Sequence, residues 1–281
     1  MGRPIAKALS AAYSVGVFDS NGERERDSPD LAWAPSLQQL AHASDVLITV
    51  VPGPSELRAV MADALPRVRP GTLWIDLTSG DPAVTRELAT RAVAVDVEVV
   101  TAPMGGSISE AERCALTFFV SGSERAVDRA LPILRELSED GGVRRAGQRA
   151  EDGQIVKLLA NGLWFANAVA ASEAMLIGQG LGLSPAAVQR LLRDSAGGSR
   201  YLDVHAERLL DGDYLTTFGI DRVVEELDTL SAMKDEGRVV TPILDASRTL
   251  HRAALNRFGP ELGELLAVKL LEDESGRQLR R

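Results

Sequence analysis

The chain has 281 residues, of which 45% are hydrophobic and 25% are charged, and its formal net charge is −9. This composition excludes collagen-like and low-complexity classes, and the acidic balance argues against binding to nucleic acid or to an anionic membrane surface. One cysteine, Cys114, and three scattered histidines provide neither a disulfide nor a zinc site. No signal peptide and no membrane-spanning run is predicted. We therefore expect a soluble cytoplasmic protein of about two domains without a bound metal.

From Ser14 to about Arg145, short apolar runs alternate with helical stretches. The runs are Ser14–Asp19, Val46–Val51, Leu73–Leu77, Val97–Thr101 and Leu116–Ser121. Runs that are apolar nearly throughout suit strands buried on both faces, as in a parallel sheet covered by helices. Pro54 and Pro82 stand where the first turn of a helix is expected. The pattern predicts a doubly wound α/β domain over residues 1–150.

After about Ala150 the pattern becomes entirely helical, which predicts an all-α domain over residues 151–281. The expected helices are Gln154–Gly180, one that opens at Ser184-Pro185, and stretches near Tyr201–Leu210, Ile220–Met233, Pro242–Leu255 and Pro260–Leu271. The long first helix is expected to join the two domains, and its apolar residues predict that much of it is buried. The polar tail, Asp273–Arg281, is predicted to be frayed.

The start of the chain fits part of a dinucleotide-binding unit. In such a unit the third glycine of G-x-G-x-x-G opens a helix, and an acidic residue at the end of the second strand binds the adenosine ribose. Gly2 and Asp19 fit these two roles, although a flexible terminal glycine and a turn-forming aspartate are the simpler alternatives. The first strand of this fold is central, so we expect upstream codons to encode it and the first two glycines.

Two polar residues lie at the head of the long helix. Lys157 and Asn161 are four residues apart, so they project from one face, one turn from each other. A lone lysine on an apolar helix is commonly a surface residue whose ammonium reaches water. Here Ile155, Leu158 and Trp164 are among its apolar neighbours, and in such surroundings a lysine can exchange protons near neutral pH.

The chain from Met1 to about Leu271 resembles the β-hydroxyacid dehydrogenase family, typified by 3-hydroxyisobutyrate dehydrogenase and related to 6-phosphogluconate dehydrogenase. The matching segments are Met1–Asp19, Val51-Pro52, Asp76–Ser79 with Pro82, Thr101–Ser107, and Gly153 with Lys157 and Asn161. Each segment is a weak signal alone, but five in order over the whole chain are specific. The retained lysine argues against the related imine reductases.

The resemblance implies hydride transfer between NAD, or NADP, and a small hydroxy acid or carbonyl substrate. Lys157 would be the general acid or base, and Asn161 would hold the same substrate oxygen. The backbone N–H groups of Gly105, Gly106 and Ser107 would receive the substrate carboxylate. The implied cofactor contacts are Gly2, Asp19, Ser20, Val51, Pro52, Ser79 and Glu225. A homodimer or higher oligomer packed along the long helix is also implied.

The chain departs from the family pattern at several positions. The substrate loop and the motifs near it carry Thr101, Gly105, Ser107, Glu110, Cys114 and Ala160 in place of the family's residues. Glu225 replaces a lysine, and its negative charge would weaken the binding of an anionic substrate. Two hypotheses remain at this point: an active oxidoreductase that favours NAD because Asp19 repels a 2′-phosphate, or a cofactor-free relative with a binding or structural role.

Overall fold

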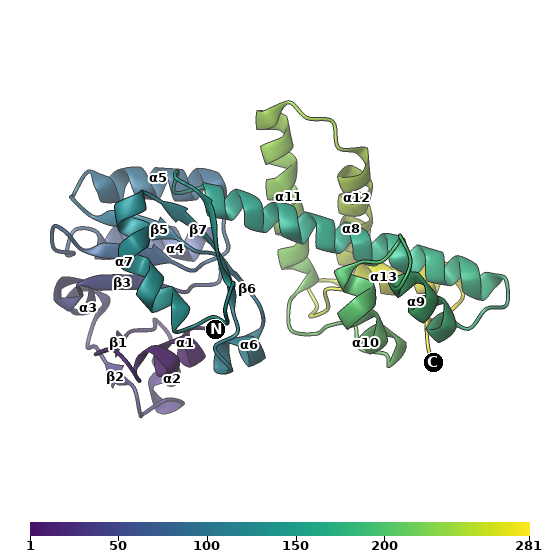
Figure 1. Ribbon diagram of the computed structural model, residues 1–281, viewed down its shortest axis with the longest axis horizontal. Coiled ribbons are helices and arrows are strands. Elements are labelled where there is room, and N and C mark those ends of the chain that lie inside the picture. The colour runs from purple at the N-terminus through teal and green to yellow at the C-terminus, as the bar shows by residue number, and fades with distance from the viewer. The chain divides into compact units, whose positions relative to one another are not determined.

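The computed structural model describes residues 1–281, and the chain divides into two compact units, Met1–Lys157 and Leu158–Arg281 (Figure 1). A 29-residue helix, α8 (Asp152–Gly180), runs through the boundary between them. The first unit is a Rossmann-like α/β unit and the second contains helices, in agreement with the predicted fold class.

The first unit contains seven helices and eight strands. The helices are α1 (Gly2–Leu9), α2 (Glu23–Arg26), α3 (Leu37–Ala43), α4 (Pro54–Ala64), α5 (Pro82–Val93), α6 (Ile108–Glu112) and α7 (Glu124–Arg135). The strands are β1 (Gly16–Val17), β2 (Ala32–Trp33), β3 (Val46–Thr49), β4 (Leu73–Asp76), β5 (Glu98–Thr101), β6 (Met104–Gly105), β7 (Thr117–Gly122) and β8 (Val143–Gly147). Pro54 and Pro82 lie in the first turns of α4 and α5, as predicted.

The main sheet has the order β3-β4-β5-β7-β6, with β8 beside β7. Strands β3, β4 and β5 are parallel. The prediction of a wholly parallel sheet is wrong for β7, which is antiparallel to β5. The chain turns back between them through β6 and the short helix α6, without a long crossover helix that would return it in the same direction.

The predicted strand Ser14–Asp19 is much shorter in the structure. Only Gly16 and Val17 form a strand, β1, which pairs with β2 in a separate two-stranded sheet. Alternation of apolar residues could not reveal this, because pairing depends on the partner strand β2, whose Ala32 and Trp33 carry too short a pattern to be recognised.

Helices pack on both faces of the main sheet, and Figure 1 shows α4, α5 and α7 alongside it. Helices α1, α6 and α7 share one apolar core with alternate residues of the strands, such as Ile75 and Phe118. Helices α3, α4 and α5 share the other core, around Trp74. Burial on both faces explains why these strands are apolar nearly throughout.

The second unit contains no strand of the main sheet, as predicted. After α8 come α9 (Pro185–Arg193), a π-helical turn η1 (Tyr201–His205), α10 (Ala206–Leu210), α11 (Ile220–Gly237), α12 (Pro242–Phe258) and α13 (Leu266–Ser275). The last helix begins six residues later than predicted. Gly259 and Gly263 have φ values of +77° and +153°, which are incompatible with a right-handed helix and end the connection before Leu266.

The C-terminal tail is ordered by specific contacts, which corrects the prediction that it is frayed. Leu279 is completely buried, and its N–H donates to the buried carboxylate of Glu272. Arg280 donates to Glu272 and to the hydroxyl of Tyr214. A polar sequence therefore packs here because its charged groups have partners within the second unit.

Helix α8 is less buried within one chain than its composition predicts. By length and composition it is the one helix in the structure that could cross a membrane. Of its most apolar 18-residue stretch, 33% is buried. A single such helix is weak evidence for a membrane span, since the core helix of a globular enzyme has the same composition. Leu163, Ala170 and Ile177 form an exposed stripe along it, and Leu181, also exposed, follows the end of the helix.

Candidate active site

The first turn of α8 is tied to the loop that follows β4. The side-chain amide of Gln154 donates to the carbonyl of Thr78 at 2.7 Å, and its oxygen accepts from the N–H of Gly80 at 2.9 Å. Gln154 is completely buried. Ser79, a predicted cofactor contact, lies between these two anchored residues, and Lys157 follows Gln154 by one turn. Gln154 was not predicted from the sequence, although a polar residue at the start of an apolar helix is a detectable signal.

Asn161 is held by an acidic residue of α11. Its side-chain Nδ2 donates to Oε2 of Glu226 at 2.6 Å. Lys157 and Asn161 both belong to α8 and lie on one face of it, one turn apart. The carboxylate of Glu226 therefore fixes the orientation of the asparagine beside the predicted proton carrier.

Glu225 was singled out from the sequence, but Glu226 makes the contact with Asn161. The carboxylate of Glu225 pairs instead with Arg222 at 2.7 Å on the same helix and is about half exposed. Glu226 follows the buried residue Val223 by three positions, so it lies beside the apolar stripe of α11. That spacing could have identified it.

A second group of predicted residues gathers at the carboxyl ends of β3 and β4. A Cβ added to Gly2 would lie 3.9 Å from the Cβ of Val50, so the start of α1 adjoins the loop after β3. In that loop the N–H of Val51 donates to the hydroxyl of Thr78 at 3.3 Å. The structure thus places Gly2 near Val50, and Val51 and Pro52 near the loop of Ser79.

The start of α1 is electropositive. Met1 precedes the helix and provides no side-chain cap for its first N–H groups. The guanidinium groups of Arg3 and Arg24 lie near this helix start. A helix start flanked by two arginines suits a phosphate group. The residues present therefore fit the pyrophosphate of a dinucleotide.

Asp19 and Ser20 lie on the surface after β1. The carboxylate of Asp19 accepts a hydrogen bond of 2.8 Å from the N–H of Asn21, which forms a local turn. This turn was the simpler alternative for Asp19 in the sequence analysis. A carboxylate oxygen has more than one lone pair, so the same group can also accept from a ribose hydroxyl.

Asp76, the last residue of β4, holds the loop that follows this strand. Its Oδ1 accepts from the hydroxyl of Thr49 at 2.7 Å and from the N–H of Thr78 at 3.1 Å. Its Oδ2 is buried without a hydrogen-bond partner. Complete burial raises the pKa of this carboxyl to about 6. Asp76 thus holds the backbone of Thr78 on one side, as Gln154 does on the other.

The predicted substrate loop contains its own anion. Gly105 ends β6, Gly106 has a φ of +124°, and Ser107 caps α6. The carboxylate of Glu110 accepts from the N–H of Ser107 at 2.9 Å and from its hydroxyl. These hydrogen bonds hold the pKa of Glu110 below its usual value. Glu110 therefore competes with a substrate carboxylate for the N–H and the hydroxyl of Ser107, and the role of Ser107 as a substrate contact stays a prediction.

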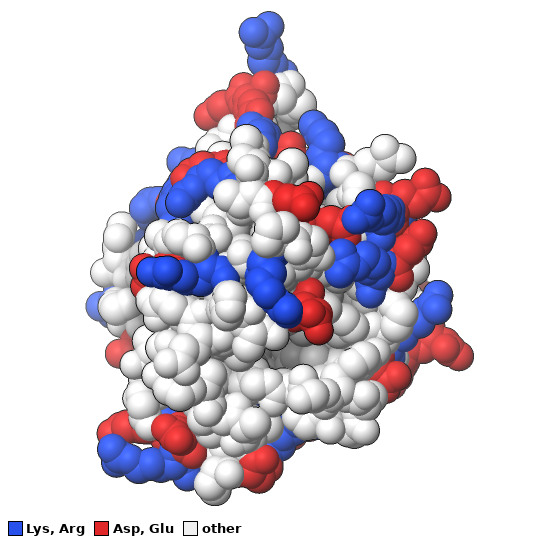
Figure 2. All heavy atoms as spheres, turned by 90° about the vertical axis from the view of Figure 1, so that its left-hand side faces the viewer, with Lys and Arg blue, Asp and Glu red and all other residues white.

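The electrostatic surface is mixed rather than strongly basic or acidic. Figure 2 shows basic and acidic side chains interspersed on one face of the protein. Many of them are paired, as in the contact of Arg58 with Glu87 at 2.9 Å. Exposed pairs of this kind contribute little to stability.

Family models match both parts of the chain. Residues 1–147 match the NAD binding domain of 6-phosphogluconate dehydrogenase. Residues 152–271 match the NAD-binding domain of NADP-dependent 3-hydroxyisobutyrate dehydrogenase. Together these matches span nearly the whole chain and disfavour the alternative of a cofactor-free relative.

Relatives of known activity agree with this assignment. The chain is 28% identical to 2-(hydroxymethyl)glutarate dehydrogenase of Eubacterium barkeri over 73% of this chain and 69% of the relative. It is 24% identical to the NAD-dependent L-serine dehydrogenase of Pseudomonas aeruginosa over 98% of this chain and 96% of the relative.

Solved structures share the fold. Mycobacterium tuberculosis 3-hydroxyisobutyrate dehydrogenase with L-serine has a TM-score of 0.87 at 22% identity, and the match covers 96% of this chain and 95% of that one. An imine reductase from Myxococcus stipitatus in complex with NAD+ has a TM-score of 0.64 at 16% identity, with 96% of both chains covered. The chain therefore belongs to the β-hydroxyacid dehydrogenase family and is an NAD(P)-dependent oxidoreductase.

Proposed function

We propose that this NAD(P)-dependent oxidoreductase interconverts a small hydroxy acid and its carbonyl form, with Lys157 as the proton carrier. The observation that carries the proposal is the arrangement of α8. Lys157 and Asn161 share a face directly after Gln154, which clasps the loop of Ser79. The nicotinamide, when bound, accepts or supplies the hydride.

The chain's own residues manage the proton and the substrate oxygen. Lys157 Nζ would take the proton of the substrate hydroxyl during oxidation and return it during reduction. One N–H of Asn161 is used by Glu226. Its second N–H and its carbonyl oxygen can orient the substrate oxygen. A positioned acid or base contributes about 10²–10⁴-fold to the rate.

The substrate loop limits where the carboxylate of a substrate can bind. Gly105, Gly106 and Ser107 remain the proposed substrate contacts, with the glycine backbone as the accessible part. Because Glu110 engages Ser107, a second anion is disfavoured at that residue. The relatives that act on hydroxy acids support the same substrate class.

Cofactor contacts are proposed for a set of residues that mostly follow the strands of the first unit. They are Gly2, Asp19, Ser20, Val51, Pro52 and Ser79, with Glu225 on α11. Asp19 favours NAD, because its carboxylate can accept from the ribose hydroxyls and repels a 2′-phosphate. The arrangement supports residues 1–150 as the dinucleotide-binding domain.

Residues 151–281 are proposed as the substrate and dimerisation domain. The exposed residues Leu163, Ala170 and Ile177 are seven residues apart along α8, a spacing that suits packing against the same helix of a second copy. A homodimer would cover it. The cytoplasm is the proposed location, since the one cysteine, Cys114, is free.

The test compares wild-type protein with Lys157→Met. Methionine keeps the length and apolar packing of the side chain and cannot carry a proton. We expect the wild type to reduce NAD+ with at least one member of a panel of 3-hydroxyisobutyrate, 3-hydroxypropionate and L-serine. Lys157→Met should bind NAD+ equally well and turn over about 10²–10⁴-fold more slowly. A variant with wild-type turnover would show that Lys157 has no role in the chemistry.

A further inference from the structure

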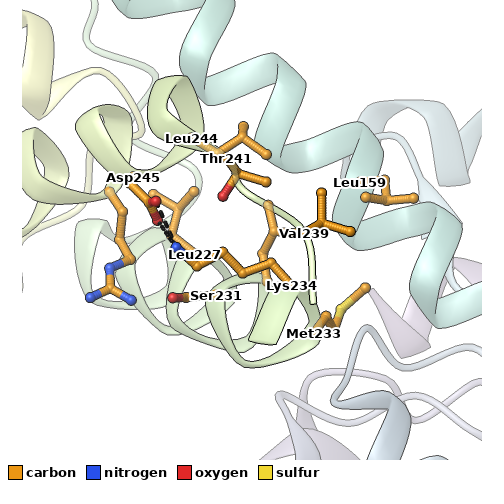
Figure 3. A pocket seen from close by; sticks show the side chains of 11 residues that line it. Leu159, Leu227, Ser231, Met233, Lys234, Val239, Thr241, Leu244 and Asp245 are labelled. Carbon is orange, nitrogen blue, oxygen red and sulfur yellow. Dashed lines mark hydrogen bonds and ion pairs between the residues drawn. The ribbon is translucent and has the colours of Figure 1, made fainter. Parts of the chain in front are cut away.

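A cavity within the second unit is lined by none of the side chains proposed for catalysis. It has a volume of about 190 Å³ and lies between α11 and α12, beside Leu159 of α8 (Figure 3). No side chain proposed above for the cofactor or the substrate lines it. The cavity is therefore a separate feature of the helical unit.

Most of its wall is aliphatic. Leu227 and Leu230 of α11 are almost completely buried and face it together with Leu244 of α12 and Met233. The cavity is open on one side, because Leu159 and Val239, which also line it, are 45% and 58% exposed. Apolar cavities of about 150 Å³ are large enough to bind a molecule the size of benzene. The space is thus suited to an apolar body of about six carbon atoms.

One end of the cavity is polar. Lys234 contacts both carboxylate oxygens of Asp245, at 2.5 and 2.6 Å, and this pair appears as dashed lines in Figure 3. The hydroxyl oxygen of Thr241 is buried and has no hydrogen-bond partner. An unsatisfied buried hydroxyl is unfavourable, so this atom indicates a position for a polar group of a ligand.

The charges at this end favour an anion. Lys234 and Arg248 both line the cavity, and Asp245 is the one acidic residue among its lining residues. Arg248 is also 3.8 Å from Asp228, a longer separation than that of the Lys234 pair. An ammonium carries three donors, so Lys234 can bind a second acceptor beside Asp245.

We propose that this cavity binds a small amphipathic carboxylate, with an apolar body of about six carbons against Leu227, Leu230 and Leu244. The carboxylate lies at Lys234 and Arg248 and accepts a hydrogen bond from the hydroxyl of Thr241. A molecule with an ammonium head is disfavoured, because the two basic residues outnumber Asp245 at this end of the cavity. The site shares no lining side chain with the proposed catalytic site.

The test uses hexanoate as a probe of the full-length protein, with hexylamine as the opposite charge. Isothermal titration calorimetry should show one hexanoate per chain with a Kd on the order of 0.1–1 mM, and no saturable binding of hexylamine. Leu244→Trp, which fills the cavity, should abolish binding. Thr241→Val removes only the hydroxyl and should weaken binding about 3–10-fold.

Two control variants locate the site. Val240→Ala alters an exposed residue in the connection between α11 and α12 that does not line the cavity. This variant should leave the Kd unchanged. Lys157→Met should also leave it unchanged, which separates this site from the catalytic one. Circular dichroism checks that Leu244→Trp is folded. If it is not folded, the Kd of Thr241→Val for hexanoate tests the site instead. Absence of saturable binding, equal binding of hexylamine, or an unchanged Kd in Thr241→Val would overturn the proposal.

Discussion

Asn161 donates a hydrogen bond of 2.6 Å to the carboxylate of Glu226. This contact joins α8 and α11 within the second unit and orients an amide one turn after Lys157. Through it, Glu226 of α11 joins Lys157 and Asn161 of α8 in a group of three polar side chains. The proposed division of labour is that Lys157 moves the proton, while Glu226 acts by positioning Asn161.

Asn161→Ala should lower kcat less than Lys157→Met does. The change removes an orienting hydrogen bond and leaves the proton carrier, so about a 10–100-fold loss is expected from hydrogen bonds of this strength. Glu226→Gln keeps an acceptor for Asn161 and should cost less than Asn161→Ala. The comparison is made by measuring the steady-state rate of NADH formation as a function of pH. In Asn161→Ala the pH values at which kcat rises and falls should be the same as in the wild type. A loss equal to that of Lys157→Met would assign Asn161 a direct part in the proton transfer.

Gln154→Leu should weaken cofactor binding and stability together. It leaves the carbonyl of Thr78 and the N–H of Gly80 without their partner, at a cost of about 1–3 kcal/mol in the free energy of unfolding. Urea denaturation and NAD+ titration by tryptophan fluorescence measure the two effects. Gln179→Leu on the same helix is the matched control, because its amide contact is at the exposed surface. Equal behaviour of the two variants would contradict the assigned role of Gln154.

Glu110→Ala should raise kcat/KM for hydroxy acids. The variant releases the N–H and hydroxyl of Ser107 and removes a negative charge from the substrate loop. We expect up to about a 10-fold gain, the effect of one charge-assisted hydrogen bond. Glu112→Ala is the control, since Glu112 is an exposed residue of the same short helix. An unchanged or lower kcat/KM in Glu110→Ala would mean that Ser107 does not meet the substrate carboxylate.

Asp76 should make the first unit less stable as the pH rises. Its folded-state pKa is raised to about 6 from a usual value of 3.8, so folding favours the protonated form. The stabilisation is complete below about pH 4 and is lost as the pH passes through 6. The ionised group costs on the order of 3 kcal/mol at pH 8, from the shift of about two pKa units.

Asp76→Asn removes this dependence and retains an acceptor for Thr49 and Thr78. The free energy of unfolding of the variant, relative to the wild type, should therefore increase by about 1–3 kcal/mol between pH 4 and pH 8. Chemical denaturation at several pH values measures the difference. Asp128→Asn, at an exposed position, should show no such trend. A difference that is constant with pH would contradict the raised pKa.

Short apolar runs and helical periodicity were sufficient to predict most of the fold. The runs that became β3, β4, β5 and β7 are apolar because helices cover both faces of the sheet, and α8 and α11 follow the spacing of apolar residues along a helix. The family resemblance, carried by five short motifs, was confirmed by the family models. Information of this kind is local, because the apolar pattern of each helix or strand reflects which of its own faces is buried.

Contacts between distant residues were decided by the tertiary structure alone. Neighbours in sequence, Glu225 and Glu226 have different partners, Arg222 and Asn161, because one projects along its own helix and the other toward α8. The tail is ordered only because Glu272 is buried where Leu279 and Arg280 can reach it. By contrast, Glu110 reaches Ser107 through a capping box at the start of α6, a local contact that the Ser-x-x-Glu spacing itself indicates. Sequence patterns report how a residue is buried, whereas a hydrogen bond depends on distances set by the packing of whole elements.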